Sequence, residues 1–223
     1  MIIQNYNGID VLRDDLLVGG TKSLLMNQLS TSVEEYVYVS PVYGALQIAL
    51  SDWCNKNNIR CTIISAKRKK RHPNTIKAEE LGSKIIEVPY GYMVVLNKVK
   101  KDYLQSNPYA KEIPFGLDTE ESRDIIAERA KVLDTYDEIW CAIGSGVLVE
   151  GILRGTTNAK VKGVVVGKEY NNNHQRLEIY HYYKPFQQLG KKTPFPSVRN
   201  YDAKAWEYCI KHHTFNTFFW NVC

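Results

Sequence analysis

Two short segments of the chain contain residues that could do chemistry. Lys22 follows the pair Gly19-Gly20, so its amine extends from a backbone that can turn sharply. Gly144-Ser145-Gly146 stands between a stretch typical of a strand and a stretch typical of a helix. Such a turn directs backbone N–H groups and the positive end of a helix dipole at one point, which favours a phosphate. The sequence thus offers an amine nucleophile and an anion site.

Neither segment is specific by itself. The glycine turn matches neither GxGxxG nor GxxxxGK[ST], and small residues also occur at such turns because they let a helix pack on a sheet. A lysine beside glycines is more often an exposed loop residue. To act as a nucleophile near neutral pH, Lys22 would need a pKa below the usual value of about 10.4, which burial can produce. The elements that position the two segments therefore decide their meaning.

Apolar stretches and amphipathic segments alternate along much of the chain. The predicted strands are residues 36–40, 60–66, 84–88, 138–143 and 160–166. The predicted helices are residues 45–56, 74–81, 92–105, 119–133, 147–153 and 202–211. Because helical connections of this length suit parallel strands, we expect an α/β fold with parallel sheets and helices on both faces.

The composition is that of an ordinary globular protein. Of 223 residues, 44% are hydrophobic and 24% are charged, which excludes disordered and fibrous classes. No apolar run approaches the roughly 18 residues needed to span a bilayer, and the N-terminus lacks a leader pattern, so we expect a cytoplasmic protein without a membrane partner. The five cysteines form no CxxC pair and the histidines are not spaced as ligands, so we expect neither disulfides nor a metal site.

The formal net charge is +5, and part of the excess lies in the run Lys67–His72. Such a run is either a solvated loop or a site that attracts phosphates or nucleic acid. Both interpretations remain open.

The segment Val11–Ser23, which contains Arg13-Asp-Asp-Leu and Gly19-Gly-Thr-Lys, resembles the stretch that carries the cofactor lysine in the fold type II pyridoxal phosphate enzymes. These enzymes form the tryptophan synthase beta-like superfamily, and the likeness is greatest to its aminocyclopropane-carboxylate deaminase and D-cysteine desulfhydrase group. Further similar segments follow in the same order: a serine turn at Ser40, then residues 77–88, 113–116, 137–146 and 201–205. The resemblance spans most of the chain.

This resemblance implies a compact version of that fold. Residues 1–223 would form a single unit of two intertwined lobes, a smaller one of about 36–110 and a larger one of about 1–35 plus 111–223. Lys22 would form a Schiff base with pyridoxal phosphate. The phosphate would be held by Gly144, Ser145, Gly146, Val147 and Leu148. The family resemblance further implies a small-molecule amine or amino-acid substrate and a homodimer.

Two of the chain's departures from the family pattern concern the substrate turn and the C-terminus. The family's serine–asparagine turn, which binds the substrate carboxylate, is here Ser40-Pro41-Val42-Tyr43-Gly44, and proline has no N–H to donate. Ser40, Tyr43 and Gly44 remain the candidate substrate-binding residues, with Tyr43 either a ligand platform or an aromatic plug. Near the C-terminus, Asn221 stands at the position where the family resemblance implies a contact with the pyridine nitrogen of the cofactor. An amide there, rather than a carboxylate, is expected to leave that nitrogen largely unprotonated.

The expected function is a pyridoxal phosphate-dependent lyase or deaminase-like enzyme, which works by elimination, deamination or proton transfer. One alternative is a short phage-encoded enzyme of DNA hypermodification in the host cytoplasm, with DNA or an amino-acid-modified pyrimidine as partner. Another is a non-catalytic descendant that binds a nucleotide or nucleic acid. A phosphoribosyltransferase is disfavoured because Ala142-Ile143, and not paired acidic residues, precede the glycine turn.

Overall fold

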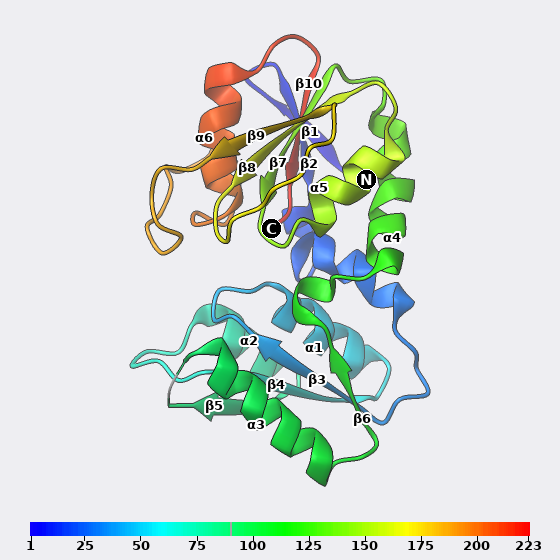
Figure 1. Ribbon diagram of the computed structural model, residues 1–223, viewed down its shortest axis with the longest axis vertical. Coiled ribbons are helices and arrows are strands. Elements are labelled where there is room, and N and C mark those ends of the chain that lie inside the picture. The colour runs from blue at the N-terminus through cyan, green and yellow to red at the C-terminus, as the bar shows by residue number, and fades with distance from the viewer. Residues whose placement is uncertain (90) are drawn as a thin grey trace. The chain divides into compact units, whose positions relative to one another are not determined.

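The computed structural model describes residues 1–89 and 91–223. The chain folds into two compact units, one of residues 1–17 and 118–223 and the other of residues 18–117. Each unit has a largely parallel sheet with helices on both faces, so the predicted α/β class is confirmed (Figure 1). Residues 18–35 and 111–117, assigned to the larger lobe from the sequence, group with the smaller unit in the structure.

The unit of residues 18–117 is built on a four-stranded sheet with the strand order β5-β4-β3-β6. All three strand pairs are parallel. The strands are β3 (Glu35–Ser40), β4 (Arg60–Ala66), β5 (Lys84–Val88) and β6 (Ala110–Ile113). The helices are α1 (Leu46–Lys56), α2 (Pro73–Glu80) and α3 (Met93–Ser106), and the segment η2 (Gly20–Gln28) is a 3-10 helix.

The central strands of this sheet are buried on both sides. Every residue of β3 is buried, which is typical of a parallel strand covered by helices on its two faces. Val37, Val39 and Ile64 pack with Leu96 of α3 on one face. Helix α1 packs on β3 and β4 and contacts α2, which packs on β5 (Figure 1). The carboxyl ends of β3 and β4 are thereby fixed at one edge of the sheet.

The unit of residues 1–17 and 118–223 contains a six-stranded sheet with the order β1-β2-β10-β7-β8-β9. Among the strand pairs that the structure describes in this sheet, β1–β2 is antiparallel and the others are parallel. The strands are β1 (Ile3–Tyr6), β2 (Ile9–Arg13), β7 (Glu138–Ile143), β8 (Lys160–Val165), β9 (Leu177–His181) and β10 (Thr217–Asn221). The helices are α4 (Glu120–Ala130), α5 (Val147–Gly155) and α6 (Asp202–His212). Short 3-10 helices are η1 (Asp14–Leu16), η3 (Phe115–Leu117, in the other unit) and η4 (Lys131–Leu133).

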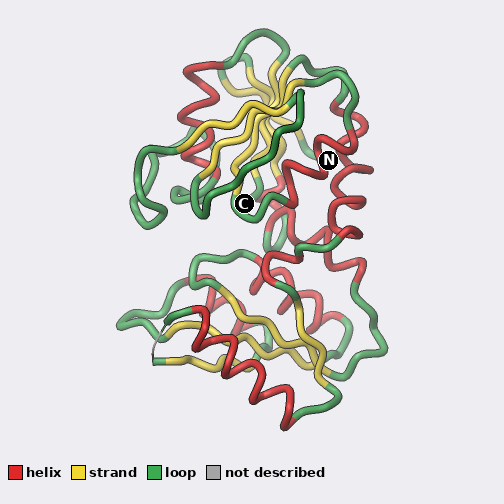
Figure 2. The backbone as a smooth tube through the Cα atoms, in the orientation of Figure 1, coloured by secondary structure: helices red, strands yellow, loops and turns green. Residues whose placement is uncertain are grey.

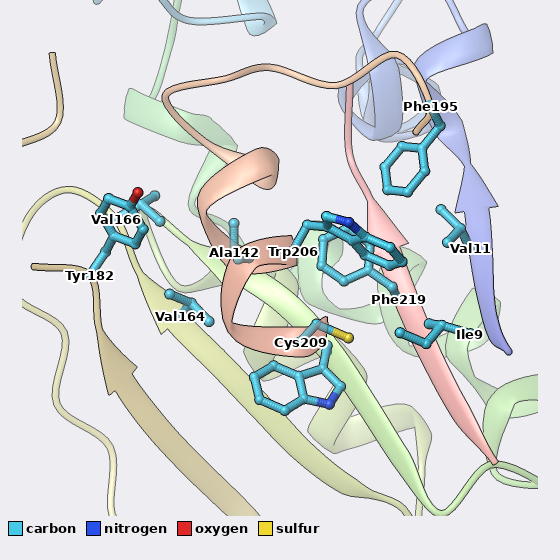
Figure 3. Close-up of a cluster of buried hydrophobic side chains, with 12 residues drawn as sticks. Ile9, Val11, Ala142, Val164, Val166, Tyr182, Phe195, Trp206, Cys209 and Phe219 are labelled. Atoms are coloured by element: carbon cyan, nitrogen blue, oxygen red, sulfur yellow. The ribbon is translucent and has the colours of Figure 1, made fainter. Parts of the chain in front are cut away.

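One face of this sheet packs against α6. Trp206 and Cys209 of the helix lie over Phe219 of β10 and Val11 of β2 (Figure 3). The rings of Trp206 and Phe219 meet nearly edge-on, with centroids 5.2 Å apart. Helix α5 packs on β7 and β8 and is itself covered by α4. This core holds β2, β7 and β10 side by side, so that their carboxyl ends lie at one edge.

Five of the strands in the described part of the chain were not predicted from the sequence: β1, β2, β6, β9 and β10. Between β9 and α6 the chain runs through a long segment without regular structure (Figure 2). None of the helices in residues 1–89 and 91–223 combines the length and the apolar character needed to cross a membrane.

Candidate functional site

Lys22 lies in the first half of η2 and is half-buried. Its Nζ atom donates a hydrogen bond of 2.6 Å to the carbonyl oxygen of Gly116, 94 residues further along the chain. Gly116 has a left-handed backbone, with φ of 68°, within the segment Ile113–Gly116 singled out from the sequence. The lysine is therefore held in a defined position and is not an exposed loop residue.

Gly19 explains why the turn before Lys22 needs glycine. Its φ is 84°, and a Cβ atom at this position would lie 2.6 Å from the backbone nitrogen of Ala49. Only a residue without a side chain allows η2 to approach the first turns of α1 this closely. Gly19 thus fixes the start of η2, and with it the direction in which Lys22 extends.

The turn after β3 satisfies its polar groups internally. Ser40 is fully buried, and its hydroxyl donates to the carbonyl of Pro41 at 2.9 Å. The N–H of Gly44 donates to the same carbonyl, also at 2.9 Å. Gln47 of α1 donates from its amide nitrogen to the carbonyls of Val42 (3.2 Å) and Gly44 (2.9 Å). The side-chain donors at this turn are therefore engaged within the turn.

Tyr43 packs against the start of α2. Its ring meets the ring of His72 edge-on, with centroids 4.9 Å apart, and Asn74 donates to its carbonyl at 3.2 Å. His72 caps α2 by accepting a hydrogen bond of 3.2 Å from the backbone N–H of Asn74. Burial lowers the pKa of His72. These contacts favour the view that the Tyr43 ring helps to close the turn.

Gln47 was not singled out from the sequence, although it is the residue that closes this turn. It is fully buried, and its Oε1 atom has no hydrogen-bond partner among the described residues. The available signal was a polar residue between Leu46 and Ile48 in an otherwise apolar helix segment. Buried polar groups without partners are rare, so this oxygen marks a position where a donor can bind.

The glycine turn after β7 leads directly into α5. Gly146 is the N-cap of the helix and has a φ of 95°. A Cβ atom on Gly146 would lie 2.5 Å from the ring of Tyr170, and one on Gly144 would lie 2.8 Å from the hydroxyl oxygen of Tyr201. Both glycines are therefore required by the close packing of two tyrosines around the turn.

The start of α5 has the features of an anion site. Val147 and Leu148 lie in its first turn, where backbone N–H groups have no acceptor within the helix. The helix dipole adds a partial positive charge at the same point. Ser145 is half-buried and carries a hydroxyl that can donate. All five predicted phosphate-binding residues thus occur together at one strand–helix junction.

A carboxylate stands close to this turn. Glu150 lies in the first turn of α5, and its two oxygens accept hydrogen bonds from the Arg123 side chain (Nε, 2.6 Å) and the Tyr170 hydroxyl (3.0 Å). The bond to Glu150 is the main reason that the pKa of Arg123 is raised. Burial raises the pKa of Tyr170 to about 12. Arg123 therefore offsets the negative charge nearest to the glycine turn.

The adjacent aspartates of the Arg13-Asp14-Asp15 run both bind the end of β10. Asp14 accepts a hydrogen bond of 3.2 Å from the Trp220 indole and pairs with Arg129. Asp15 pairs with Arg13 and accepts a hydrogen bond of 2.8 Å from the Asn221 amide nitrogen. The run was recognised in the sequence as part of a motif, but its role in holding Asn221 was not.

Tyr201 is half-buried beside the glycine turn, and the next residue, Asp202, is buried. Burial raises the pKa of both residues well above the usual values for their side chains. Asp202 accepts a hydrogen bond of 3.2 Å from the backbone N–H of Cys223, which ties the last residue to the start of α6. This contact fixes the segment that follows Asn221.

The predicted residues fall into two groups by unit. Lys22, Ser40, Tyr43 and Gly44 belong to residues 18–117, and the glycine turn and Asn221 belong to the other unit. Within the described part of the chain, no cluster of three or more His, Cys, Asp or Glu side chains could hold a metal ion.

Comparison with known proteins relates the chain to others through structure alone. No family model matches the sequence, and no curated protein matches it. Among solved structures, a homologue of ACC deaminase superposes with a TM-score of 0.78 at 14% identity, covering 96% of this chain and 83% of the other. A hydrogen sulfide-producing enzyme from Fusobacterium nucleatum gives a TM-score of 0.73 at 11% identity, covering 100% and 91%.

A third solved structure extends the same likeness. An O-acetylserine dependent cystathionine beta-synthase from Helicobacter pylori gives a TM-score of 0.67 at 14% identity, covering 96% of this chain and 85% of the other. At these identities the similarity establishes the fold. The chain has the fold of the fold type II pyridoxal phosphate enzymes.

Proposed function

We propose that this protein is a pyridoxal phosphate-dependent enzyme that acts on an amine or amino-acid substrate by elimination, deamination or proton transfer. The observation that carries the proposal is the position of Lys22. In a chain of this fold, the only lysine of the glycine-flanked N-terminal motif is half-buried and anchored at Gly116. It is the residue that would bind the cofactor covalently through the aldehyde.

The glycine turn fits the phosphate of this cofactor. The turn carries no side chain at Gly144 or Gly146, and the N–H groups at the start of α5 can donate to phosphate oxygens. The Ser145 hydroxyl adds a donor, and the pairing of Glu150 with Arg123 reduces the repulsion that a phosphate would meet. The buried Oδ1 atom of Asn221, which has no hydrogen-bond partner in residues 1–89 and 91–223, is a further polar group that a ligand could bind.

Bound pyridoxal phosphate would supply an electron sink for the bond being broken at the substrate Cα. Lys22 would have two tasks: to hold the cofactor, and, once the substrate amine has displaced it, to move the proton at the substrate Cα. A lysine can serve as such a base when its amine is partly shielded from water, which agrees with the half-buried position of Lys22.

The turn at Ser40–Gly44 differs from the serine–asparagine turn with which the resembled family binds the carboxylate of a small amino acid. This difference favours another kind of substrate. Pro41 has no N–H, and the donors of Ser40 and Gln47 are engaged by carbonyls of the turn itself. A substrate carboxylate would therefore find fewer donors here. We infer that selectivity at this turn depends on backbone N–H groups at the start of α1 and on Gln47 Oε1, an acceptor that suits a substrate donor.

The experiment that tests the proposal is the addition of pyridoxal phosphate to the purified full chain. We expect a visible absorption band, and after borohydride reduction we expect peptide mapping to find the cofactor on Lys22. Lys22→Ala should abolish both signals, whereas Lys56→Ala, which removes an exposed lysine of α1 paired with Asp52, should leave them unchanged. A protein that stays colourless with excess cofactor would refute the proposal.

A second candidate function has one observation in its favour. Lys67, Arg68, Lys69 and Lys70 are all exposed in the loop that follows β4, whereas Arg71 is held by Glu79 and Glu87. Such a loop suits DNA or a modified nucleotide, either as the substrate of the enzyme or as the ligand of a non-catalytic binding protein. Salt-dependent DNA binding that is lost when the four residues become glutamine would support this function, and binding unchanged in that variant would refute it.

A further inference from the structure

The orientation of the Asn221 amide is fixed by its neighbours. Asn221 is fully buried at the end of β10. Its amide nitrogen donates one hydrogen bond of 2.8 Å to Asp15 Oδ1 and another of 3.0 Å to the carbonyl oxygen of Pro196. A backbone carbonyl oxygen accepts hydrogen bonds but cannot donate them, and the same is true of an ionised carboxylate. The NH2 group must therefore face these two atoms, and the Oδ1 atom must face the other way.

The Oδ1 atom, on the opposite side of the amide, is buried and has no hydrogen-bond partner among the described residues. Because an amide oxygen accepts and never donates, the missing partner must be a donor. Buried acceptors are seldom left unpaired in folded proteins, so a ligand with an N–H or O–H group is the natural complement.

The contact with Asp15 makes this oxygen a stronger acceptor. Asp15 forms a two-pronged pair with Arg13, whose Nε and Nη2 atoms each lie 2.8 Å from a carboxylate oxygen. The side chains of Arg13 and Asp15 are only 8% and 5% exposed. At a site so shielded from water, the Asp15 carboxylate polarises the Asn221 N–H group that donates to it. This polarisation increases the negative charge on Asn221 Oδ1.

Asn221 also lies at the edge of the sheet where the glycine turn begins. Trp220 of β10 is paired with Cys141 of β7, so Asn221 is level with Ala142, and neighbouring strands are about 5 Å apart. Gly144 comes two residues after Ala142, directly after the end of β7. The acceptor and the proposed phosphate site thus belong to adjacent strand ends of one unit.

We propose that Asn221 Oδ1 accepts a hydrogen bond from the ring nitrogen of pyridoxal phosphate, and that the cofactor is bound with this nitrogen protonated. The inference rests on the proposed function. It reverses the expectation from the sequence that an amide at this position leaves the nitrogen largely unprotonated. An amide can donate or accept, and here Asp15 and the Pro196 carbonyl use its donor side.

A protonated ring withdraws electrons more strongly than a neutral one. Asn221 would then be a cofactor-binding residue that keeps the ring electron-withdrawing. Among the proposed reactions, this favours those in which negative charge accumulates at the substrate Cα. Asp15 and Arg13 would act through Asn221 without touching the cofactor.

The direct test is the 15N NMR resonance of ring-labelled pyridoxal phosphate bound to the full chain. We expect a protonated nitrogen in the natural protein and a shift toward the unprotonated form in Asn221→Ser, whose hydroxyl can donate, and in Asp15→Asn, which removes the polarising charge. Asp14→Asn is the matched control, because Asp14 binds Trp220 and Arg129 but not Asn221. An unprotonated nitrogen in the natural protein would overturn the inference.

A second measurement needs no variant to fold. The analogue 1-deazapyridoxal phosphate has C–H in place of the ring nitrogen and cannot donate to Asn221. We expect the natural protein to bind pyridoxal phosphate about tenfold to a hundredfold more tightly than this analogue, as for a hydrogen bond with a charged partner. Equal affinities would overturn the inference, whereas a cofactor that never attaches to Lys22 would refute the proposed function itself.

Discussion

The two strand–turn–helix junctions of the molecule use the same architecture in opposite ways. The turn of residues 40–44 connects β3 to α1, and the turn of residues 144–146 connects β7 to α5. In the first, the Ser40 hydroxyl and the Gln47 amide bind carbonyls of the turn. In the second, two glycines leave the backbone at the start of the helix uncovered by side chains of their own.

This difference shows how a junction becomes a ligand site. A helix N-terminus offers N–H groups in both cases, but side chains decide whether the turn in front of it is filled. Pro41 removes one N–H from the first turn and Gln47 ties its carbonyls, so that turn is mainly a structural closure. The second turn keeps its capacity for an anion, and changes at each junction should therefore have different consequences.

The largest effect is expected from Gly146→Ala. The substitution forces a side chain into a backbone with φ of 95° and places a Cβ atom 2.5 Å from the Tyr170 ring. The left-handed backbone alone should cost about 1–2 kcal/mol of the free energy of unfolding. Because the turn must also shift, the affinity for pyridoxal phosphate should fall about a hundredfold, measured by titration of the absorption band.

Gly8→Ala is the matched control for this prediction. Gly8 has a similar φ of 83°, but a Cβ atom there meets nothing within 4 Å. The control should lose a similar amount of stability from the backbone without any change in cofactor affinity. If the two variants bound the cofactor equally well, the glycine turn would not be its phosphate site.

The second effect concerns the closed turn. In Gln47→Leu, the buried carbonyl of Val42 loses the amide that donates to it, and the carbonyl of Gly44 keeps the 3.4 Å hydrogen bond from Asn74. We expect the free energy of unfolding in urea to fall by about 2 kcal/mol, because buried acceptors without partners are costly. Cofactor affinity should change much less than in Gly146→Ala.

Gln28→Leu provides the comparison for this loss. Gln28 is half-buried, and its amide nitrogen donates a hydrogen bond of 2.8 Å to the carbonyl of Leu25, three residues earlier in the chain. Its replacement should cost less than about 1 kcal/mol. A loss as large as that of Gln47→Leu would show that closure of the turn is not the reason for the effect.

The third prediction tests the charge beside the open turn. Arg123→Gln leaves Glu150 without its main partner near Gly146, so a phosphate would meet an unbalanced negative charge. We expect about a fivefold to tenfold loss of cofactor affinity, since both side chains are partly exposed and solvent screens the interaction. The double variant Arg123→Gln with Glu150→Gln should recover most of the loss. A double variant as weak as the single one would contradict an electrostatic origin.

The sequence was most informative where burial is continuous. Strands β3, β4 and β7 appeared as unbroken runs of apolar and β-branched residues, because they are covered on both faces. The edge strand β9 was not predicted, since Leu177–His181 mixes half-buried and exposed residues. The β1–β2 hairpin was also overlooked, although Asn7-Gly8 between two strands is a strong hairpin signal.

The candidate site was predictable in its residues but not in its hydrogen bonds. Lys22 and the glycine turn carry local signals, because glycine requirements can be recognised from neighbouring residues. The contact between Lys22 and Gly116 joins residues 94 positions apart, and the contact between Asn221 and Asp15 joins residues 206 positions apart. No local pattern indicates which way the Asn221 amide faces, so its acceptor role followed only from the folded structure.

The smallest effect is expected from pH at the closed turn. His72 accepts a hydrogen bond from the N–H of Asn74, which requires a neutral ring nitrogen, and burial lowers the pKa of His72. A base with a lowered pKa stabilises the folded state above its unfolded pKa of about 6.5. This stabilisation is lost as the pH falls from there through the folded pKa. Asparagine at position 72 keeps a capping oxygen but does not titrate.

We therefore expect natural protein to lose stability relative to His72→Asn as the pH falls below about 6.5, by less than about 1 kcal/mol. Urea unfolding across this pH range measures the difference. The reference is His174→Asn, which removes an imidazole with the same contact, from Nδ1 to the N–H two residues further on, at an exposed position. An equal pH dependence of the His72→Asn and His174→Asn differences would contradict burial of the His72 cap of α2 as the cause.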